Sequence, residues 1–285
     1  MAMSSNAPHH HPRPPQSHRI GTEHGSVSSV LINIVVGLIT SVISGTAVWT
    51  GQRLLALRRR QRAAVFFGVR AGERCRLVIY RTPWQPSPDS MRHADVQALV
   101  DLAVLLRELG AEPEVVPFDQ LAEGPGHQTE FCIGGPTVNA RTQTHLARYL
   151  PGVTMRPWDR TRRDSIAIVV GEQQFLHNPP LGPGRTEQEQ VYAVLARFVP
   201  PSGDHPVFVI SGQTALANRG AVQFLTRPGN QRQLRRLADG DATGGGRFCL
   251  VVQVASPRVY GHQLVEVASD ATAAAFAPTA ASQPE

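Results

Sequence analysis

Residues 130–150 read EFCIGGPTVNARTQTHLARYL, and this stretch decides how the rest of the chain is interpreted. Residues 131–133 form a short apolar run, which is typical of a strand covered on both faces. The segment Gly134-Gly135-Pro136 closes that run, because proline donates no backbone hydrogen bond and glycine tolerates a positive φ. The sequence therefore predicts a buried strand that ends in a tight turn.

A helix is predicted to follow this turn. Thr137 or Asn139 can cap it through a side-chain oxygen, and Leu146 and Leu150 share its apolar face. A strand, a glycine turn and a helix N-terminus leave backbone amides that can bind an anion such as phosphate, although an ordinary tight turn is the alternative. Neither G-x-G-x-x-G nor a phosphate-loop motif is present, and the chain has no lysine. The predicted ligand-binding residues here are Gly134, Gly135, Asn139 and Arg141.

A second stretch repeats this pattern. Residues 207–210 are an apolar run that enters a Ser211-Gly212 turn, and residues 215–225 then have helical character. Two such turns would lie at the carboxyl edge of a parallel sheet, where open α/β sheets bind ligands. The predicted ligand-binding residues of the second turn are Ser211, Gly212, Thr214 and Arg219.

The remaining pattern predicts an α/β domain. Residues 76–80 and 114–117 read as strands, and the amphipathic segment 91–110 between them reads as a helix, which makes a right-handed βαβ unit with parallel strands. Residues 190–198 fit either a helix or a strand. Their β-branched and aromatic content favours a strand paired with 207–210 as a hairpin. Further strands are predicted at 165–170, 248–255 and 263–268, the last two as a C-terminal hairpin, and a short basic helix at 234–239.

Composition limits the class of protein. The chain has 285 residues, 41% of them hydrophobic, which is enough for one sizeable α/β domain with accessory segments. The net charge is +6, but several arginines gather in one block at 53–62, so we expect no specific nucleic-acid binding. The three cysteines lie in or beside apolar runs without C-x-x-C spacing, which favours buried thiols over disulfides or a metal site.

An uncharged run from 27 to 52 is long enough to cross a bilayer as a helix. It is too long for the apolar part of a signal peptide, and a buried helix of a soluble protein is the alternative. Five arginines follow the run closely, whereas only Arg13 and Arg19 precede it. The positive-inside rule then predicts a single-pass protein of the plasma or inner membrane, with the N-terminus outside and the C-terminal domain in the cytoplasm.

One face of this run carries small or polar residues at every fourth position: Ser29, Asn33, Gly37, Ser41 and Gly45. Such a face allows close helix approach, so we expect a homo-oligomer formed through the membrane helix. The predicted organisation is a disordered Pro- and His-rich N-terminus (1–26), a transmembrane helix (27–52), an arginine-rich juxtamembrane segment (53–71), an α/β domain (72–270) and a disordered tail (271–285).

Four features together resemble a poorly characterised Rossmann-like α/β domain of prokaryotes: Ile133-Gly-Gly-Pro136 with Asn139, the Tyr192–Arg197 strand, the Ile210-Ser-Gly212 turn, and Asn218-Arg-Gly-Ala221. The resemblance covers about 76–268. It implies a three-layer, largely parallel fold, but the segment 213–217 lacks a second glycine that the pattern has. A single span joined to such a domain also resembles bacterial membrane-anchored sensors or effectors.

Three functions are compatible with these features. The first is a membrane-anchored sensor or effector that binds a nucleotide-like or anionic ligand, to which Arg81 can contribute. The others are a nucleotide-processing hydrolase and a protein-interaction scaffold without a small ligand. A buried acid beside Gly134 or Gly212 would favour the hydrolase, but Asp119 and Glu130 are expected in loops. His127, His145 and His177 are expected at the surface; no catalytic residue, metal or cofactor is assigned.

Overall fold

The computed structural model describes residues 26–81, 90–162, 164–177, 189–241, 244–256 and 264–278. The chain divides into two compact units, Met1–Ala56 and Leu57–Glu285. The disorder predicted for residues 1–25 and for the end of the tail lies outside the described residues.

The first unit holds most of the long helix α1 (Ser26–Phe67). Its stretch Val30–Phe67 has a window of mean hydropathy 2.0 and is long and apolar enough to cross a membrane. Large apolar side chains such as Leu38 and Trp49 are exposed along it. The helix continues without a break through the arginine-rich segment, so most of residues 53–71 is helix and not a separate linker.

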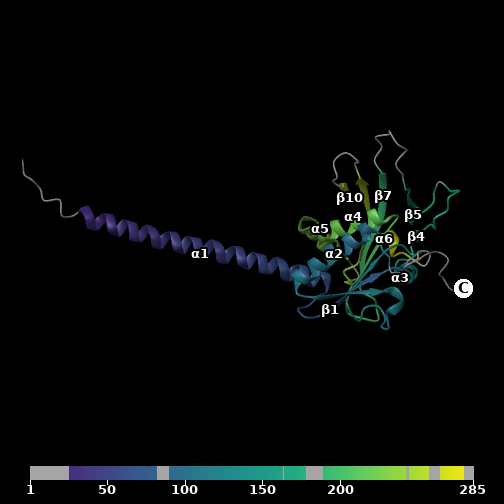
Figure 1. The fold of residues 1–285 in the computed structure, drawn as a ribbon, viewed down its shortest axis with the longest axis horizontal. Coiled ribbons are helices and arrows are strands. Elements are labelled where there is room, and N and C mark those ends of the chain that lie inside the picture. The colour runs from purple at the N-terminus through teal and green to yellow at the C-terminus, as the bar shows by residue number, and fades with distance from the viewer. Residues whose placement is uncertain are drawn as a thin grey trace, which may run out of the picture. The chain divides into compact units, whose positions relative to one another are not determined.

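The second unit is built on a seven-stranded sheet (Figure 1). The strands lie in the order β10-β9-β7-β8-β3-β1-β2. The bounds are β1 (Arg74–Ile79), β2 (Glu112–Pro117), β3 (Glu130–Ile133), β7 (Glu189–Phe198), β8 (Val207–Gly212), β9 (Phe248–Ser256) and β10 (Leu264–Asp270). The mixed α/β class is confirmed, and residues 190–198 are indeed a strand that pairs with β8.

The expected largely parallel sheet is wrong in one respect. β1 pairs in parallel with β2 and β3, and β3 with β8, but β7, β9 and β10 form an antiparallel half. The predicted hairpins β7–β8 and β9–β10 are both present. The difference arises because β9 crosses over and pairs with the outer edge of β7, which already runs against β8.

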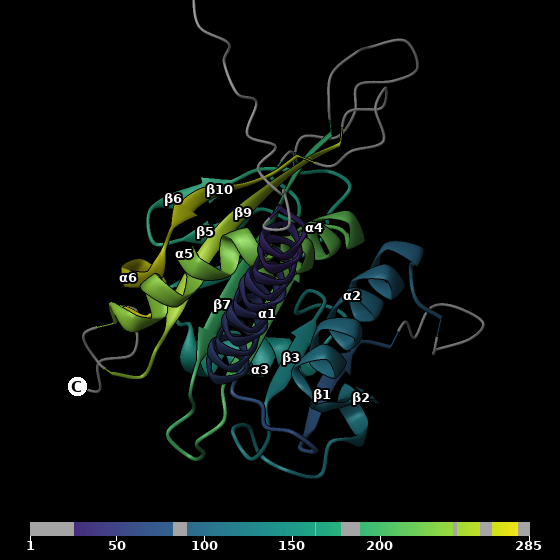
Figure 2. The same ribbon diagram turned by 90° about the vertical axis from the view of Figure 1, so that its left-hand side faces the viewer.

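Helices cover one face of the sheet, and helices together with a smaller sheet cover the other (Figure 2). The first face carries α2 (His93–Leu109), α4 (Ala215–Thr226), α5 (Pro228–Asp239) and the end of α1. The second carries α3 (Ala140–Tyr149), α6 (Thr272–Ala275) and the three-stranded antiparallel sheet of β4 (Val153–Met155), β5 (Ile168–Val170) and β6 (Gln173–Phe175). A single turn of 3-10 helix, η1 (Phe118–Gln120), follows β2.

The end of α1 belongs to the core of the second unit. The rings of Phe66 and Phe67 are buried and pack against Phe131, Phe208 and Phe248, with 6.3 Å between the centroids of the stacked Phe66 and Phe248 rings. The folded domain therefore begins before residue 72, where the sequence had placed its start. Because several arginines precede Phe66 and Phe67, the sequence pattern indicated a juxtamembrane segment and did not identify these two residues as part of the core.

Two other expectations concern the C-terminal tail and the cysteines. The predicted tail begins with helix α6, in which Ala275 is buried and Thr272 Oγ1 accepts a hydrogen bond from the Cys249 amide at 3.0 Å. The apolar pattern of this alanine-rich segment is too weak to predict that it packs against the domain. The cysteines Cys75, Cys132 and Cys249 are all buried and free, as predicted.

Candidate functional site

The carboxyl ends of β1 and β3 form the edge where the sequence placed a ligand. These strands are parallel neighbours, yet the helices that follow them pack on opposite faces of the sheet: α2 on one and α3 on the other. The connections after the two strands thus diverge, which leaves a crevice at the strand ends.

A pocket of about 320 Å³ occupies this region. It lies beyond the ends of β1, β2 and β3, beside the first turn of α3. Its lining residues are Arg81, Phe118, Asp119, Pro136, Thr137, Val138, Ala140 and Gln143. Arg81 forms an ion pair with Asp119, with 3.3 Å between Nη1 and Oδ2. The pocket therefore combines a cation, a carboxylate and the N-terminal turn of a helix.

The first glycine turn borders this pocket, but its predicted binding residues serve the fold. Asn139 is fully buried, and its Oδ1 accepts hydrogen bonds from the amides of Arg141 and Thr142 at 3.1 and 3.2 Å. Those two amides are therefore not available to a phosphate. Gly134 has φ +109°, and a Cβ there would lie 2.8 Å from the Tyr80 ring. Gly135 lies close to Gly212 of the second turn, so the two turns are adjacent as predicted.

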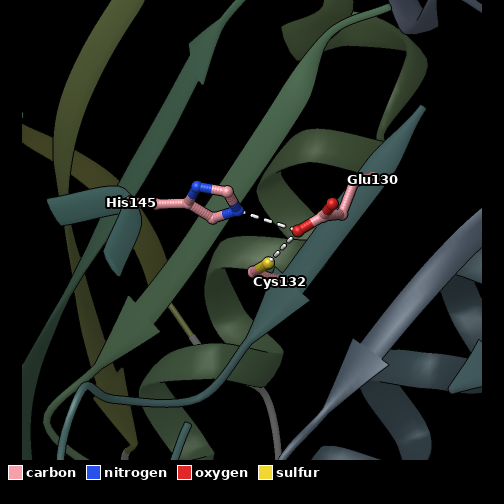
Figure 3. Close-up of side chains that lie close together, drawn as sticks. All are labelled: Glu130, Cys132 and His145. Carbon is pink, nitrogen blue, oxygen red and sulfur yellow. Dashed lines mark hydrogen bonds and ion pairs between the residues drawn. The ribbon is translucent and has the colours of Figure 1, made fainter. Parts of the chain in front are cut away.

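A buried cluster of Glu130, Cys132 and His145 lies on the α3 side of β3 (Figure 3), and Arg141 contacts its carboxylate. The Nε and Nη2 atoms of Arg141 donate to the two carboxylate oxygens of Glu130 at 2.8 and 2.7 Å. His145 Nε2 and Cys132 Sγ lie 2.8 and 2.9 Å from Glu130 Oε1. Two expectations are wrong here: Glu130 lies on a strand with 1% exposure, and His145 is fully buried.

Electrostatics keep Glu130 ionised. Burial alone would raise its pKa, but the hydrogen bonds and charges of Arg141 and His145 outweigh burial and hold the pKa well below its usual range. Burial and the neighbouring carboxylate raise the pKa of the Cys132 thiol well above its ordinary value. The sulfur is thus a neutral donor, which suits packing better than nucleophilic attack.

Glu130, Cys132 and His145 also qualify as a trio of metal donors, since their ligand atoms lie within 4.8 Å of one another. Zinc accepts this mixture of oxygen, sulfur and nitrogen ligands. However, both carboxylate oxygens already receive charge-assisted hydrogen bonds, and Arg141 places a positive charge beside them. The Glu130 carboxylate is therefore already satisfied within the protein, as part of a buried ion pair that ties α3 to β3.

The second glycine turn is closed by side chains of the domain itself. Ser211 is buried and donates to Met155 Sδ at 2.8 Å. The Gly212 amide donates to Asn218 Oδ1 at 2.7 Å, and Thr214 caps α4 by accepting from the Ala217 amide at 3.3 Å. These contacts fill the positions that a phosphate would use. Arg219 lies in α4, half-buried, and its Nε has no hydrogen-bond partner among the described residues.

Asp95 is a buried acidic residue that was not predicted from the sequence. It lies in the first turn of α2, 1% exposed, where Tyr80 Oη donates to its Oδ2 at 2.7 Å and Asn218 Nδ2 to its Oδ1 at 2.9 Å. Burial raises its pKa, against the opposing effect of these two hydrogen bonds. The signal in the sequence was an acid placed at the start of the clearest helix.

Comparison with protein-family models, curated proteins and solved structures found no match for this chain. The chemistry of the site therefore rests on its own geometry.

Proposed function

We propose that this is a single-pass membrane-anchored protein whose cytoplasmic α/β domain binds a small anionic ligand of the nucleotide class, as a sensor or effector. The observation that carries this proposal is the pocket at the diverging ends of β1 and β3. Ligands of open α/β sheets bind at such points, and a helix N-terminus favours negative charge. A Rossmann-like origin of the fold belongs to the same proposal.

Arg81 is the residue that we assign to anion recognition in this pocket. Its guanidinium is a planar donor matched to phosphate and carboxylate groups. Asp119 holds it in place at 3.3 Å. Thr137 and Gln143 supply neutral hydrogen-bonding groups on the α3 side. By contrast, Asn139, Arg141, Ser211 and Gly212 are excluded from our ligand set, because their contacts stabilise the fold.

The membrane assignment rests on α1. Its apolar stretch precedes a block of arginines that would lie against anionic headgroups on the cytoplasmic side. Self-association through Asn33, Gly37, Ser41 and Gly45 is part of the proposal. A membrane two-hybrid assay tests it, since Gly37→Ile with Ser41→Ile should abolish the signal, and an unchanged signal would remove this element.

A hydrolase remains the second candidate because Asp95 lies beside both turns. It contacts Tyr80, which packs on Gly134, and Asn218, which binds Gly212. Its exposure of 1% and its two hydrogen bonds favour a structural role. A nucleotide that binds and is also consumed by the purified protein, with consumption lost in Asp95→Asn, would favour the hydrolase.

The test uses the full chain in a non-ionic detergent. All three cysteines are buried, so a thiol-reactive dye reports unfolding directly. Mono-, di- and cyclic nucleotides are added one at a time, since a ligand that binds only the native state raises the melting temperature. We expect one of them to raise it, and Arg81→Gln to remove the rise.

One control variant accompanies this test. Arg160→Gln removes an equal charge from an exposed position outside the pocket and should keep the rise. A rise retained in Arg81→Gln would place the ligand elsewhere. If no nucleotide alters the melting temperature of the folded protein, the ligand proposal is wrong, and the scaffold function becomes the better account.

A further inference from the structure

A second pocket, of about 490 Å³, lies on the opposite side of the sheet from α3, between the end of α1, α5 and β7. Five arginines line it: Arg62, Arg197, Arg232, Arg235 and Arg236. Asp239 is the one carboxylate among its lining residues. The pocket belongs wholly to the second unit and shares no lining residue with the carboxyl-edge pocket.

Most of the positive charge of this pocket has no ion-pair partner among the described residues. Arg62, Arg232, Arg235 and Arg236 form no ion pair with any described residue, whereas Arg76, Arg81 and Arg141 elsewhere each have a carboxylate partner. Like charges gathered at one concave site repel one another unless an anion binds between them. The imbalance therefore favours a bound anion.

Arg197 forms the floor of the pocket. Its side chain comes from β7, is 9% exposed, and donates through Nε to the Phe66 carbonyl at 3.2 Å and through Nη1 to the Gly246 carbonyl. Its guanidinium lies 5.7 and 5.9 Å from the ring centroids of Phe66 and Phe208. Burial lowers the pKa of Arg197 to about 10, so it remains charged at neutral pH.

The local backbone is shaped around this buried cation. Gly246 has φ +61°, and a Cβ at that position would lie 2.6 Å from Arg197 Nη1. No described carboxylate forms an ion pair with Arg197. Its described contacts are carbonyl oxygens and ring faces, which hold the guanidinium without a paired carboxylate, and Arg197 therefore adds positive charge to the lining of the pocket.

We infer that this arginine pocket binds a phosphate-bearing group, carried either by a phospholipid headgroup or by a soluble phosphate compound. An arginine guanidinium can donate two parallel hydrogen bonds to a phosphate group. The volume of the pocket is within the range of small-molecule binding sites. Val65, which is 79% exposed on the rim, gives an amphiphilic ligand an apolar contact. Arg62 also follows the apolar run closely in the sequence, which suits the lipid source.

The experiment uses the full chain in dodecyl maltoside micelles with the thiol-reactive dye. One arm adds inorganic pyrophosphate, and the other adds phosphatidic acid to the micelles, with sodium chloride and phosphatidylcholine as the respective matched additions. We expect a rise in melting temperature of about 5–10 °C at a ligand concentration of about 100 times Kd. A rise with pyrophosphate identifies a soluble source, and a rise with phosphatidic acid alone identifies the lipid.

The decisive variant is Arg232→Gln with Arg236→Gln, since both side chains are exposed and their removal should leave the fold intact. We expect it to lose at least tenfold in affinity. The control is Arg148→Gln with Arg160→Gln, which removes the same charge from exposed positions elsewhere and should bind like the wild type.

Two outcomes would overturn the inference. The first is that neither pyrophosphate nor phosphatidic acid raises the melting temperature. The second is that both double variants lose affinity equally, which would mean that the ligand is attracted by net charge alone. If the decisive variant melts early without ligand, Arg62→Gln provides an independent test on another element and should weaken binding as well. Because Arg81→Gln should leave this binding unchanged, a failure here is separable from a failure at the carboxyl-edge pocket.

Discussion

Asn218 accepts a hydrogen bond from the Gly212 amide through Oδ1, at 2.7 Å, and donates to Asp95 through Nδ2, at 2.9 Å. One amide side chain thus links the second glycine turn to the first turn of α2. Its Oδ1 takes up the Gly212 amide that a phosphate-binding turn would offer to a ligand, and a Cβ on Gly212 would lie 2.7 Å from this oxygen.

Asn218→Ala should therefore destabilise the domain. It leaves the Gly212 amide and one Asp95 oxygen buried without a partner, and each such group costs about 1–3 kcal/mol. We expect a lower free energy of unfolding, measured by urea titration of the full chain in detergent. Gln233→Ala, on the exposed side of α5, should change stability by less than about 0.5 kcal/mol.

Glu130→Gln should be strongly destabilising at neutral pH. The change leaves Arg141 as a half-buried cation without its carboxylate, and breaking a buried pair costs about 3–5 kcal/mol. Because the folded pKa of Glu130 lies below its unfolded value, its stabilisation is present above pH ~4.5 and is lost as the pH falls further. The difference in the free energy of unfolding between wild type and variant should become smaller below that pH. A difference that does not change with pH would contradict this account.

Asp95→Asn should show the opposite dependence on pH. The pKa of Asp95 is raised by burial, so its contribution is fully present below its unfolded value of 3.8 and is lost as the pH rises through the folded pKa. The asparagine variant does not ionise, so its stability relative to the wild type should increase with pH. Urea titrations at several pH values check this, and a relative decrease would mean that the ionised acid is stabilised.

Phe67→Ala should lower the free energy of unfolding by about 3–5 kcal/mol, which is the usual effect of truncating a buried phenylalanine. Its ring is fully buried between Phe66, Phe131 and Phe208. Val65→Ala, two positions earlier on the same helix, is the matched control, since Val65 is exposed and should tolerate the change. Thermal unfolding followed with the thiol-reactive dye compares the two variants, and equal melting temperatures would place Phe67 outside the core.

Local pattern was sufficient for most elements of the fold. The helix α2 and strands β1, β3, β8, β9 and β10 follow from apolar periodicity and glycine or proline punctuation, which act within a few residues. The position of β9 beside β7 could not be predicted in this way. The sequence of residues 248–255 does not specify whether this strand pairs antiparallel with the outer edge of β7 or parallel with another strand. That choice depends on how the helices that connect the strands pack on the sheet.

The candidate site was predictable only in outline. The two glycine turns are adjacent, as the repeated motif indicated, but Asn139 and Asn218 close them. An asparagine that caps a helix and one that binds a ligand look alike in a sequence, and only the direction of the side chain separates them. The partners of Glu130 escaped notice for a similar reason: Arg141 and His145 lie one helical turn apart on α3, and their shared face becomes meaningful only once α3 packs on β3.

The burial of Phe66 and Phe67 also has a consequence during synthesis of the protein. These residues leave the ribosome before Phe131, Phe208 and Phe248, the rings that enclose them. The nascent chain therefore carries an uncovered aromatic pair until β9 has been translated. A product that terminates before Phe248 would keep its apolar N-terminal helix but lack a closed core, which makes it a substrate for chaperones and quality-control proteases.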